Sequence, residues 1–184
     1  MDGIEDLERW AADARARDAA DARVRERWLR AQAEEDASLA GALLACAERE
    51  ETVVLTTVDG RRHRGTVAGV GLDFCAVVAP GGTSTLVALD ALAEVRPADP
   101  GARRRSPAAG DGRDRASLGV RLADVLAQAA GQRPRISVQA GAASVVGDLR
   151  TVGSDVLTVR TDGTGGLVYV RLPSVSAVSF LASG

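Results

Sequence analysis

Residues 65–73 read GTVAGVGLD, and residues 147–155 read GDLRTVGSD. The second stretch repeats the first, and the match extends outward in both directions. The pairs at the same offset are Val54 and Ile136, Gly65 and Gly147, Val67 and Leu149, Val70 and Val152, Gly71 and Gly153, and Asp73 and Asp155. At an offset larger by one, the pairs are Leu89 and Leu172, Leu92 and Val175, and Val95 and Val178. The repeat predicts two copies of one structural unit, with one extra loop residue in the second.

Each repeat contains alternating stretches rich in Val, Thr and Leu, separated by turn signals such as Asp59-Gly60. In the first repeat these stretches predict strands at residues 52–58, 62–70, 73–79, 84–89 and 92–96, with counterparts in the second. Gly65 and Gly147 lie in the middle of a strand, where glycine is typical of a sharp bend. We therefore expect each five-stranded antiparallel sheet to curl into a small barrel.

A short helical pattern precedes the strands of each repeat. Ser38 and Ser117 are the expected N-caps of these helices, and Gly131 is the expected end of the second one. Further upstream, residues 1–37 lack proline and are rich in Ala, Arg and Glu, which predicts one long helix. Trp10 and Trp28 are separated by five whole helical turns, so both fall on one side. That stripe either packs on its own domain or binds a partner helix.

Residues 96–117 are rich in Pro, Gly and Arg and have no periodicity, so they predict a flexible linker. The predicted organisation is an N-terminal helix at 1–37, a first barrel at 38–95, this linker, and a second barrel at 118–184. The fold class is mainly β with helices (α+β).

The composition excludes several classes of protein. The net charge of −2 is weak for a protein that binds nucleic acid mainly through phosphates. There is no apolar run near the ~20 residues of a membrane span, and no signal peptide pattern, so we expect a cytoplasmic protein. All 23 basic residues are arginine, which is typical of high-GC bacterial genomes.

The helix and five strands, and the stretch from Asp59 to Gly69 with its Asp-Gly turn followed by Gly65, resemble the Sm/LSm superfamily and its Sm1 motif. The whole chain also resembles an uncharacterised family of high-GC Gram-positive bacteria sometimes labelled Fis-type transcriptional regulators, although no helix-turn-helix pattern is present. The Sm resemblance implies tandem Sm-like barrels, with RNA as a candidate partner. Of the Sm2 Arg-Gly pair, Arg171 matches the arginine and Leu172 replaces the glycine.

Catalytic chemistry is not indicated by any motif. His63 stands among arginines, where we expect a solvated or locally paired imidazole, and Cys46 and Cys75 are expected to be buried structural thiols. Asp73 and Asp155 are expected to form local backbone hydrogen bonds in turns. We find no metal-ligand spacing, phosphate loop or nucleotide fingerprint, so no metal, cofactor or small-molecule substrate is expected.

The sequence therefore predicts a non-catalytic cytoplasmic interaction or oligomerisation module. Its expected mechanism is pairing of edge strands, between the repeats or between chains, with Trp10 and Trp28 as partner-binding residues. The alternative is an Sm-type RNA-binding regulator that uses Arg61, Arg62, Arg64 and Arg171 at phosphates. A third candidate is a transcriptional regulator that acts through a protein partner.

Overall fold

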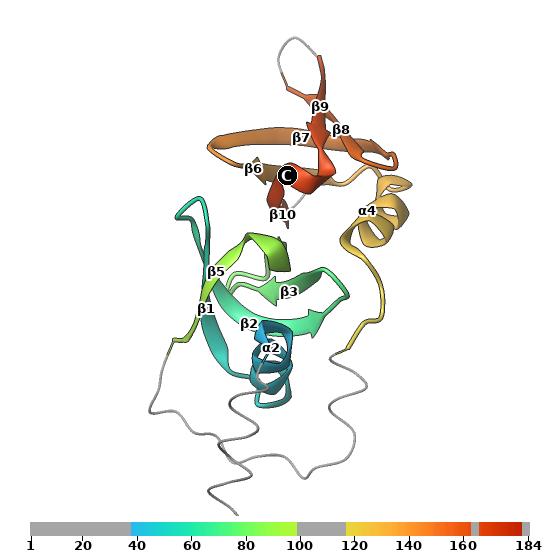
Figure 1. Cartoon of the computed structure of the whole chain (residues 1–184). Helices are drawn as coiled ribbons and strands as arrows, with labels where there is room; N and C mark the ends of the chain where they lie inside the picture. The colour runs from blue at the N-terminus through green and yellow to red at the C-terminus, as the bar shows by residue number, and fades with distance from the viewer. Residues whose placement is uncertain (1–37, 99–116, 163–165, 182–184) are drawn as a thin grey trace, which may run out of the picture. The chain divides into compact units, whose positions relative to one another are not determined.

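The computed structural model describes residues 38–98, 117–162 and 166–181 (Figure 1). The first repeat comprises α2 (Leu39–Glu48), β1 (Thr52–Thr57), β2 (Arg62–Val70), β3 (Phe74–Val78), β4 (Ser84–Ala88), the 3-10 turn η1 (Leu89–Ala91) and β5 (Leu92–Pro97). The second comprises α4 (Leu122–Ala130), β6 (Arg135–Ala140), β7 (Ala143–Val152), β8 (Val156–Thr161), β9 (Leu167–Arg171), η2 (Leu172–Ser174) and β10 (Val175–Phe180). The predicted order of one helix and five strands per repeat is confirmed. The expected N-terminal helix and most of the expected linker lie outside the described residues.

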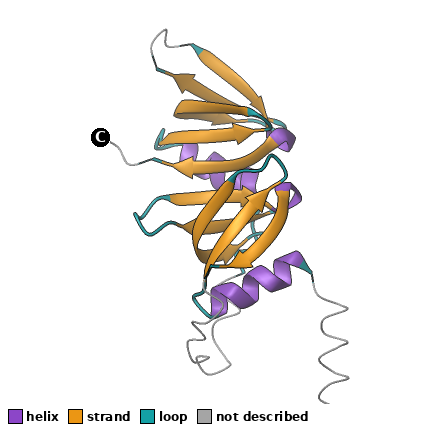
Figure 2. Ribbon diagram, turned by 90° about the vertical axis from the view of Figure 1, so that its left-hand side faces the viewer, coloured by secondary structure: helices purple, strands orange, loops and turns teal. Residues whose placement is uncertain are grey.

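All ten of these strands belong to one antiparallel sheet, in the order β5-β1-β2-β3-β4-β10-β6-β7-β8-β9. Figure 2 shows the strands in orange. The prediction of two separate small barrels is wrong, because neither set of five strands closes on itself. Instead, β4 pairs with β10 of the other repeat, through Thr85 with Ser179, Leu86 with Val178, and Val87 with Ala177. This pairing of edge strands between the repeats makes the sheet continuous. It leaves β5 and β9 as the outer strands.

The register corrects the sequence alignment by one position. Val53 pairs with Gly65, and Ile136 pairs with Gly147, so Val53 rather than Val54 is the counterpart of Ile136. Val53 and Ile136 are both fully buried, whereas Val54 is only partly buried. Because a slip of one residue moves a side chain to the opposite face of a strand, the misalignment assigned the wrong face to Val54. The segment from Val53 to Gly65 is therefore one residue longer than the segment from Ile136 to Gly147.

The two helices align at the same offset as Val53 and Ile136. In this alignment, the fully buried Leu43 is the counterpart of the fully buried Leu126. Ser117 is therefore not an N-cap: it bridges to Val70, and Arg121 occupies the N-cap of α4. The prediction of Gly131 as the C-terminal end of α4 is confirmed.

Gly65 and Gly147 lie where β2 and β7 run close to a neighbouring strand. A Cβ added at Gly65 would lie 2.4 Å from the Val78 carbonyl oxygen, and one added at Gly147 would lie 2.1 Å from the Arg160 carbonyl oxygen. Shortly after each glycine, the β2–β3 and β7–β8 ladders shift register at a bulge. A missing side chain followed by a bulge is typical of a strongly bent strand, as predicted.

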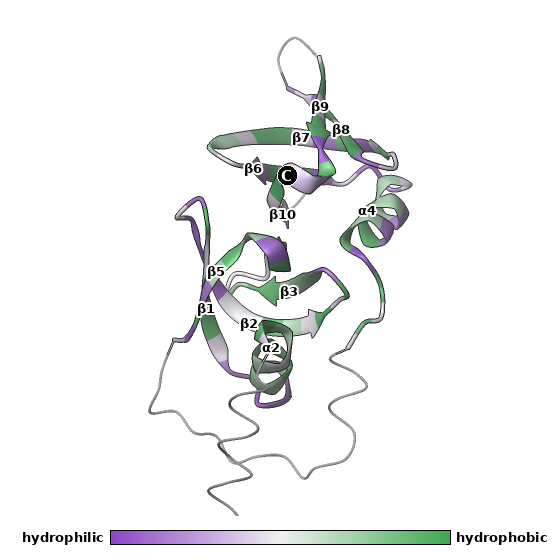
Figure 3. Ribbon diagram, in the orientation of Figure 1, coloured by the Kyte–Doolittle hydropathy of each residue, from purple (hydrophilic) through white to green (hydrophobic). Residues whose placement is uncertain are grey.

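The sheet separates two hydrophobic cores, one on each face of β3 and β4. Cys75, Val77 and Val87 pack in the core of the first repeat, with Leu43, Val53 and Leu55. The alternating residues Phe74 and Leu86 pack in the core of the second repeat, with Leu122, Leu126 and Ile136. Burial on both faces explains why β3 is continuously apolar (Figure 3) and why Leu86, Val87 and Ala88 follow one another in β4.

Each helix contributes to the core of its own repeat. Leu43 and Cys46 are the buried residues of α2, which packs mainly against β2, and Leu122 and Leu126 are those of α4, which packs against β7. Neither helix has the length and hydropathy that crossing a bilayer requires, and none of the other described residues forms such a helix.

Candidate functional site

The first repeat contacts the second through a polar cluster beside the β4–β10 ladder. Asp59, in the β1–β2 turn, accepts hydrogen bonds from Thr57 at the end of β1 and from the buried Ser176 of β10, whose Oγ lies 3.0 Å from Asp59 Oδ2. These hydrogen bonds, that of Thr57 first, lower the pKa of the Asp59 carboxyl. Arg61 adds a second connection between the repeats, because its Nη2 donates to the Ala142 carbonyl oxygen at 3.3 Å. The Asp-Gly turn of the sequence motif is thus an inter-repeat contact.

His63 is the second residue of β2, and its Nε2 is buried without a hydrogen-bond partner. Burial lowers the pKa of this imidazole, the nearby Asp59 carboxylate raises it, and Arg61 lowers it further. Burial has the largest effect, so the neutral form is favoured. The expectation of a solvated or locally paired imidazole is therefore wrong for this nitrogen.

A second inter-repeat contact fixes the start of α4. Asp73 Oδ1 accepts a hydrogen bond of 2.7 Å from the backbone N–H of Leu122, the first residue of the helix. Arg121 Nη1 lies 3.9 Å from Asp73 Oδ2. The segment 118–120 runs along the end of β2, since Leu118 N donates to Val70 O and Leu72 N donates to Val120 O. Asp73 therefore caps a helix of the other repeat rather than a local turn.

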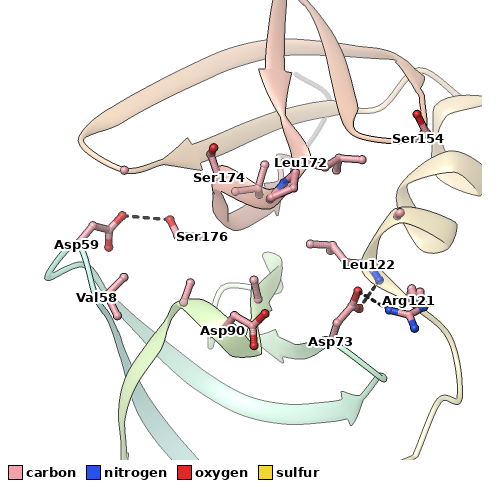
Figure 4. Close-up of a pocket in the computed structure, with 16 residues that line it drawn as sticks. Val58, Asp59, Asp73, Asp90, Arg121, Leu122, Ser154, Leu172, Ser174 and Ser176 are labelled. Atoms are coloured by element: carbon pink, nitrogen blue, oxygen red, sulfur yellow. Dashed lines mark hydrogen bonds and ion pairs between the residues drawn. The ribbon is translucent and has the colours of Figure 1, made fainter.

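A cavity of about 670 Å³ lies between these two contacts (Figure 4). Its walls are the equivalent turns η1 and η2, together with the start of α4 and the β2–β3 turn. The charged side chains that line it are Asp59, Asp73, Asp90 and Arg121. An excess of carboxylates disfavours a phosphate ligand here, and Asp59 and Asp73 already have hydrogen-bond partners within the protein.

The outer strand β9 carries two exposed hydrophobic side chains. Leu167 is 51% exposed, and Tyr169 is 67% exposed although its counterpart on β4, Leu86, is buried. At the other end of the sheet, β5 carries an ion pair between Glu94 and Arg96, followed by Pro97. Charges and proline on an edge strand restrict unspecific strand addition.

The arginines proposed for RNA binding do not form one surface. Arg61, Arg62 and Arg64 belong to β2 or its preceding turn, whereas Arg171 ends β9, at the far edge of the sheet. Arg61 is paired with Asp59, its Nε lying 3.7 Å from Oδ2. Within the described residues, further arginines have acidic partners: Arg49 with Glu51, Arg96 with Glu94, Arg121 with Asp73, and Arg135 with Asp162. Trp10 and Trp28 lie outside the described residues.

The expected burial of both cysteines is confirmed. Cys46 and Cys75 are buried free thiols, and burial raises the pKa of Cys75 to about 12. No group of three or more His, Cys, Asp or Glu side chains within the described ranges is arranged to hold a metal ion.

Two inter-repeat residues were missed from the sequence. Ser176 gave no signal beyond its place in a mostly apolar strand. Asp73 was noticed as a repeated position, but its partner on α4 required the tertiary structure.

No protein-family model matches the chain, and no curated protein sequence matches it closely enough to indicate a relative.

Proposed function

We propose that this chain is a non-catalytic cytoplasmic interaction module that binds a further β-strand at the outer strands of its sheet. The observation that carries the proposal is the β4–β10 ladder, in which an edge strand of one repeat already binds an edge strand of the other. The same sheet leaves β5 and β9 without a second neighbour among the described strands. Addition of a strand to such an edge is a common mode of protein recognition.

The inter-repeat ladder combines backbone pairing with side-chain burial. Leu86 and Val178 are both buried, and Thr85 Oγ1 lies 2.9 Å from Ser179 Oγ across the same two strands. Cross-strand contacts of this kind supply specificity in addition to the backbone hydrogen bonds. A strand that binds β9 or β5 is expected to be selected in the same way.

A second candidate function is RNA binding, as the Sm resemblance implies. Arg64 and Arg96 both pair with Val54 from opposite sides and therefore lie on one face of the sheet, and Arg62 follows on the same face. Of these three, Arg96 is paired with Glu94, and the cavity between the repeats is predominantly acidic. These charges favour the strand-binding module over RNA.

The test is the light-scattering mass of the purified chain at several concentrations, with the ratio of absorbance at 260 and 280 nm before and after a high-salt wash. An assembly that contains protein alone, and that the edge variant Tyr169→Lys disrupts, would support the module. Nucleic acid that salt releases would support the RNA candidate instead, because phosphate contacts weaken steeply with salt. A mass that Tyr169→Lys leaves unchanged, with rapid amide hydrogen exchange in both outer strands, would overturn the strand-binding proposal.

A further inference from the structure

We propose that the cavity between the repeats is an open groove that binds an arginine-containing peptide segment of a partner protein. The central contact joins a guanidinium group of that segment to the carboxylate of Asp90. This groove is separate from the outer strands β5 and β9, so it is a second binding surface and stands or falls independently of strand binding. Three features of the groove support it: its exposed walls, an apolar surface next to Asp90, and an unbalanced negative charge.

The cavity has both buried and exposed lining residues. Leu122 and Val175 are 6% and 3% exposed, whereas Asp90 on η1 and Pro173 and Ser174 on η2 are exposed (Figure 4). A cavity with this range of burial opens to solvent between its walls. Its volume of about 670 Å³ is within the range of ligand-binding clefts. An open groove of this size accepts side chains of an extended peptide that continues beyond it.

An exposed apolar side chain lies next to Asp90. Val58 is 70% exposed, and its backbone N–H donates to the Ala91 carbonyl oxygen at 2.8 Å, which holds the β1–β2 turn against η1. Arginine matches an apolar surface beside a carboxylate, because its aliphatic stem covers the apolar side chain while its head remains charged. The planar guanidinium also donates two parallel hydrogen bonds to one carboxylate, which lysine does not.

The charges of the groove favour a cationic segment. In Figure 4, Asp90 lies between Asp59 on one side and Asp73 on the other. Hydrogen bonds from the protein hold both of these outer carboxylates in place. Each has an arginine nearby at a longer distance, with Arg61 Nε 3.7 Å from Asp59 and Arg121 Nη1 3.9 Å from Asp73. Within the described residues, Asp90 has no such neighbour, so its charge is available to a ligand.

Fluorescence anisotropy with the full chain tests whether the groove binds arginine. The probe is a fluorescein-labelled nonapeptide in which arginine alternates with alanine. The control probe has citrulline in place of arginine, because citrulline keeps the shape of the side chain and removes its charge. We expect the arginine probe to bind at least about tenfold more tightly, with an affinity that decreases as salt increases. Equal binding of the two probes, or no binding of either, would overturn the proposal.

Two charge changes locate the bound peptide. Asp90→Asn removes the negative charge of the central carboxylate, and Val58→Lys adds a positive charge beside it; both side chains are exposed, so both variants are expected to fold. Each is expected to weaken binding of the arginine probe about fivefold. Glu50→Gln is the matched control, because it makes the same change in net charge at an exposed residue that does not line the cavity. We expect it to change the affinity by less than about twofold.

The outcomes also distinguish between occupants of the groove. Weaker binding to Asp90→Asn and Val58→Lys, with little change in Glu50→Gln, supports a basic peptide in the groove. Equal effects of all three variants would overturn it, because the attraction would then come from the net charge of the chain. The run from Arg103 to Arg105 supplies arginines within the same chain. If their replacement by alanine tightens probe binding at least about tenfold, this run occupies the groove in place of a partner, and the partner segment is overturned.

Discussion

The contact between Asp73 and the start of α4 predicts a measurable difference between two equivalent aspartates. Asp73→Ala removes the acceptor for the Leu122 N–H, which Asp73 Oδ1 binds at 2.7 Å across the repeat boundary. Asp155→Ala makes the same chemical change at the equivalent turn, where the described part of the chain provides no hydrogen bond to the carboxylate. Both variants are made in the Tyr169→Lys background, so that association between chains does not contribute to stability.

The expected cost of Asp73→Ala comes mainly from the lost cap. Removing a capping carboxylate lowers the free energy of unfolding by about 1 kcal/mol, within a range of about 0.5–2 kcal/mol. The ion pair with Arg121 adds little, because the two atoms are 3.9 Å apart and the side chains of Arg121 and Asp73 are 65% and 38% exposed. We expect a total of about 1–1.5 kcal/mol for Asp73→Ala and less than about 0.5 kcal/mol for Asp155→Ala. Asp73→Asn is expected to fall between them.

Urea denaturation followed by circular dichroism measures these differences. The midpoint of Asp73→Ala should fall below that of Asp155→Ala with an unchanged slope, which indicates a change in stability rather than in the surface exposed on unfolding. Equal losses for the two alanine variants would refute the reasoning, since the cap would then contribute nothing specific. A loss for Asp73→Asn as large as that for Asp73→Ala would also contradict it.

Three more predictions concern the bend, the core and pH. Gly147→Ala is expected to lower the free energy of unfolding by about 1–3 kcal/mol or more, because the new Cβ would lie 2.1 Å from a carbonyl oxygen. Gly81→Ala is the control and should change the free energy of unfolding little, because no atom lies within 4 Å of the added Cβ. Equal denaturation midpoints for the two variants would contradict this prediction. Leu126→Ala should cost about 2–5 kcal/mol and Leu39→Ala, in a monomeric chain, well under half of that, which the same denaturation experiment checks. Because burial lowers the folded-state pKa of His63, the unfolded chain binds more protons as pH falls through its ordinary value of 6.5. Stability should therefore decrease below that pH by at most about 1.4 kcal/mol per pH unit, and a pH titration of His63→Gln should lack that decrease.

Much of the secondary structure could be predicted from local sequence. The strands at residues 62–70 and 84–88 were placed to within a residue, because alternation and turn residues act over a few neighbours. The glycine bends were found because a conspicuous glycine recurs in each repeat. The predicted N-cap of α4 was wrong. Ser117 is a good capping residue, but in the structure it forms a β-bridge with Val70, and the helix begins five residues later.

The candidate site was less predictable, because its residues come from segments far apart in the chain. Asp59 of the first repeat accepts a hydrogen bond from Ser176, near the end of the second repeat, and Asp73 accepts one from Leu122, which follows the segment that joins the repeats. The local sequence around one residue of each pair does not indicate its partner. The exposure of Tyr169 likewise depends on which strand lies beside β9, and this is a property of the whole sheet.

The sequence by itself determined the repeat, the order of helix and strands in each copy, the bends and the burial of the cysteines. Each of these depends on composition and spacing within a single repeat or between its two copies. Only the tertiary structure decided whether each copy closes into a barrel or joins its neighbour. The outcome depends on which strand pairs with the edge of β4. In the structure this strand is β10, and the pairing buries Leu86 and Phe74 in the core of the second repeat while Val87 and Cys75 remain in the core of the first.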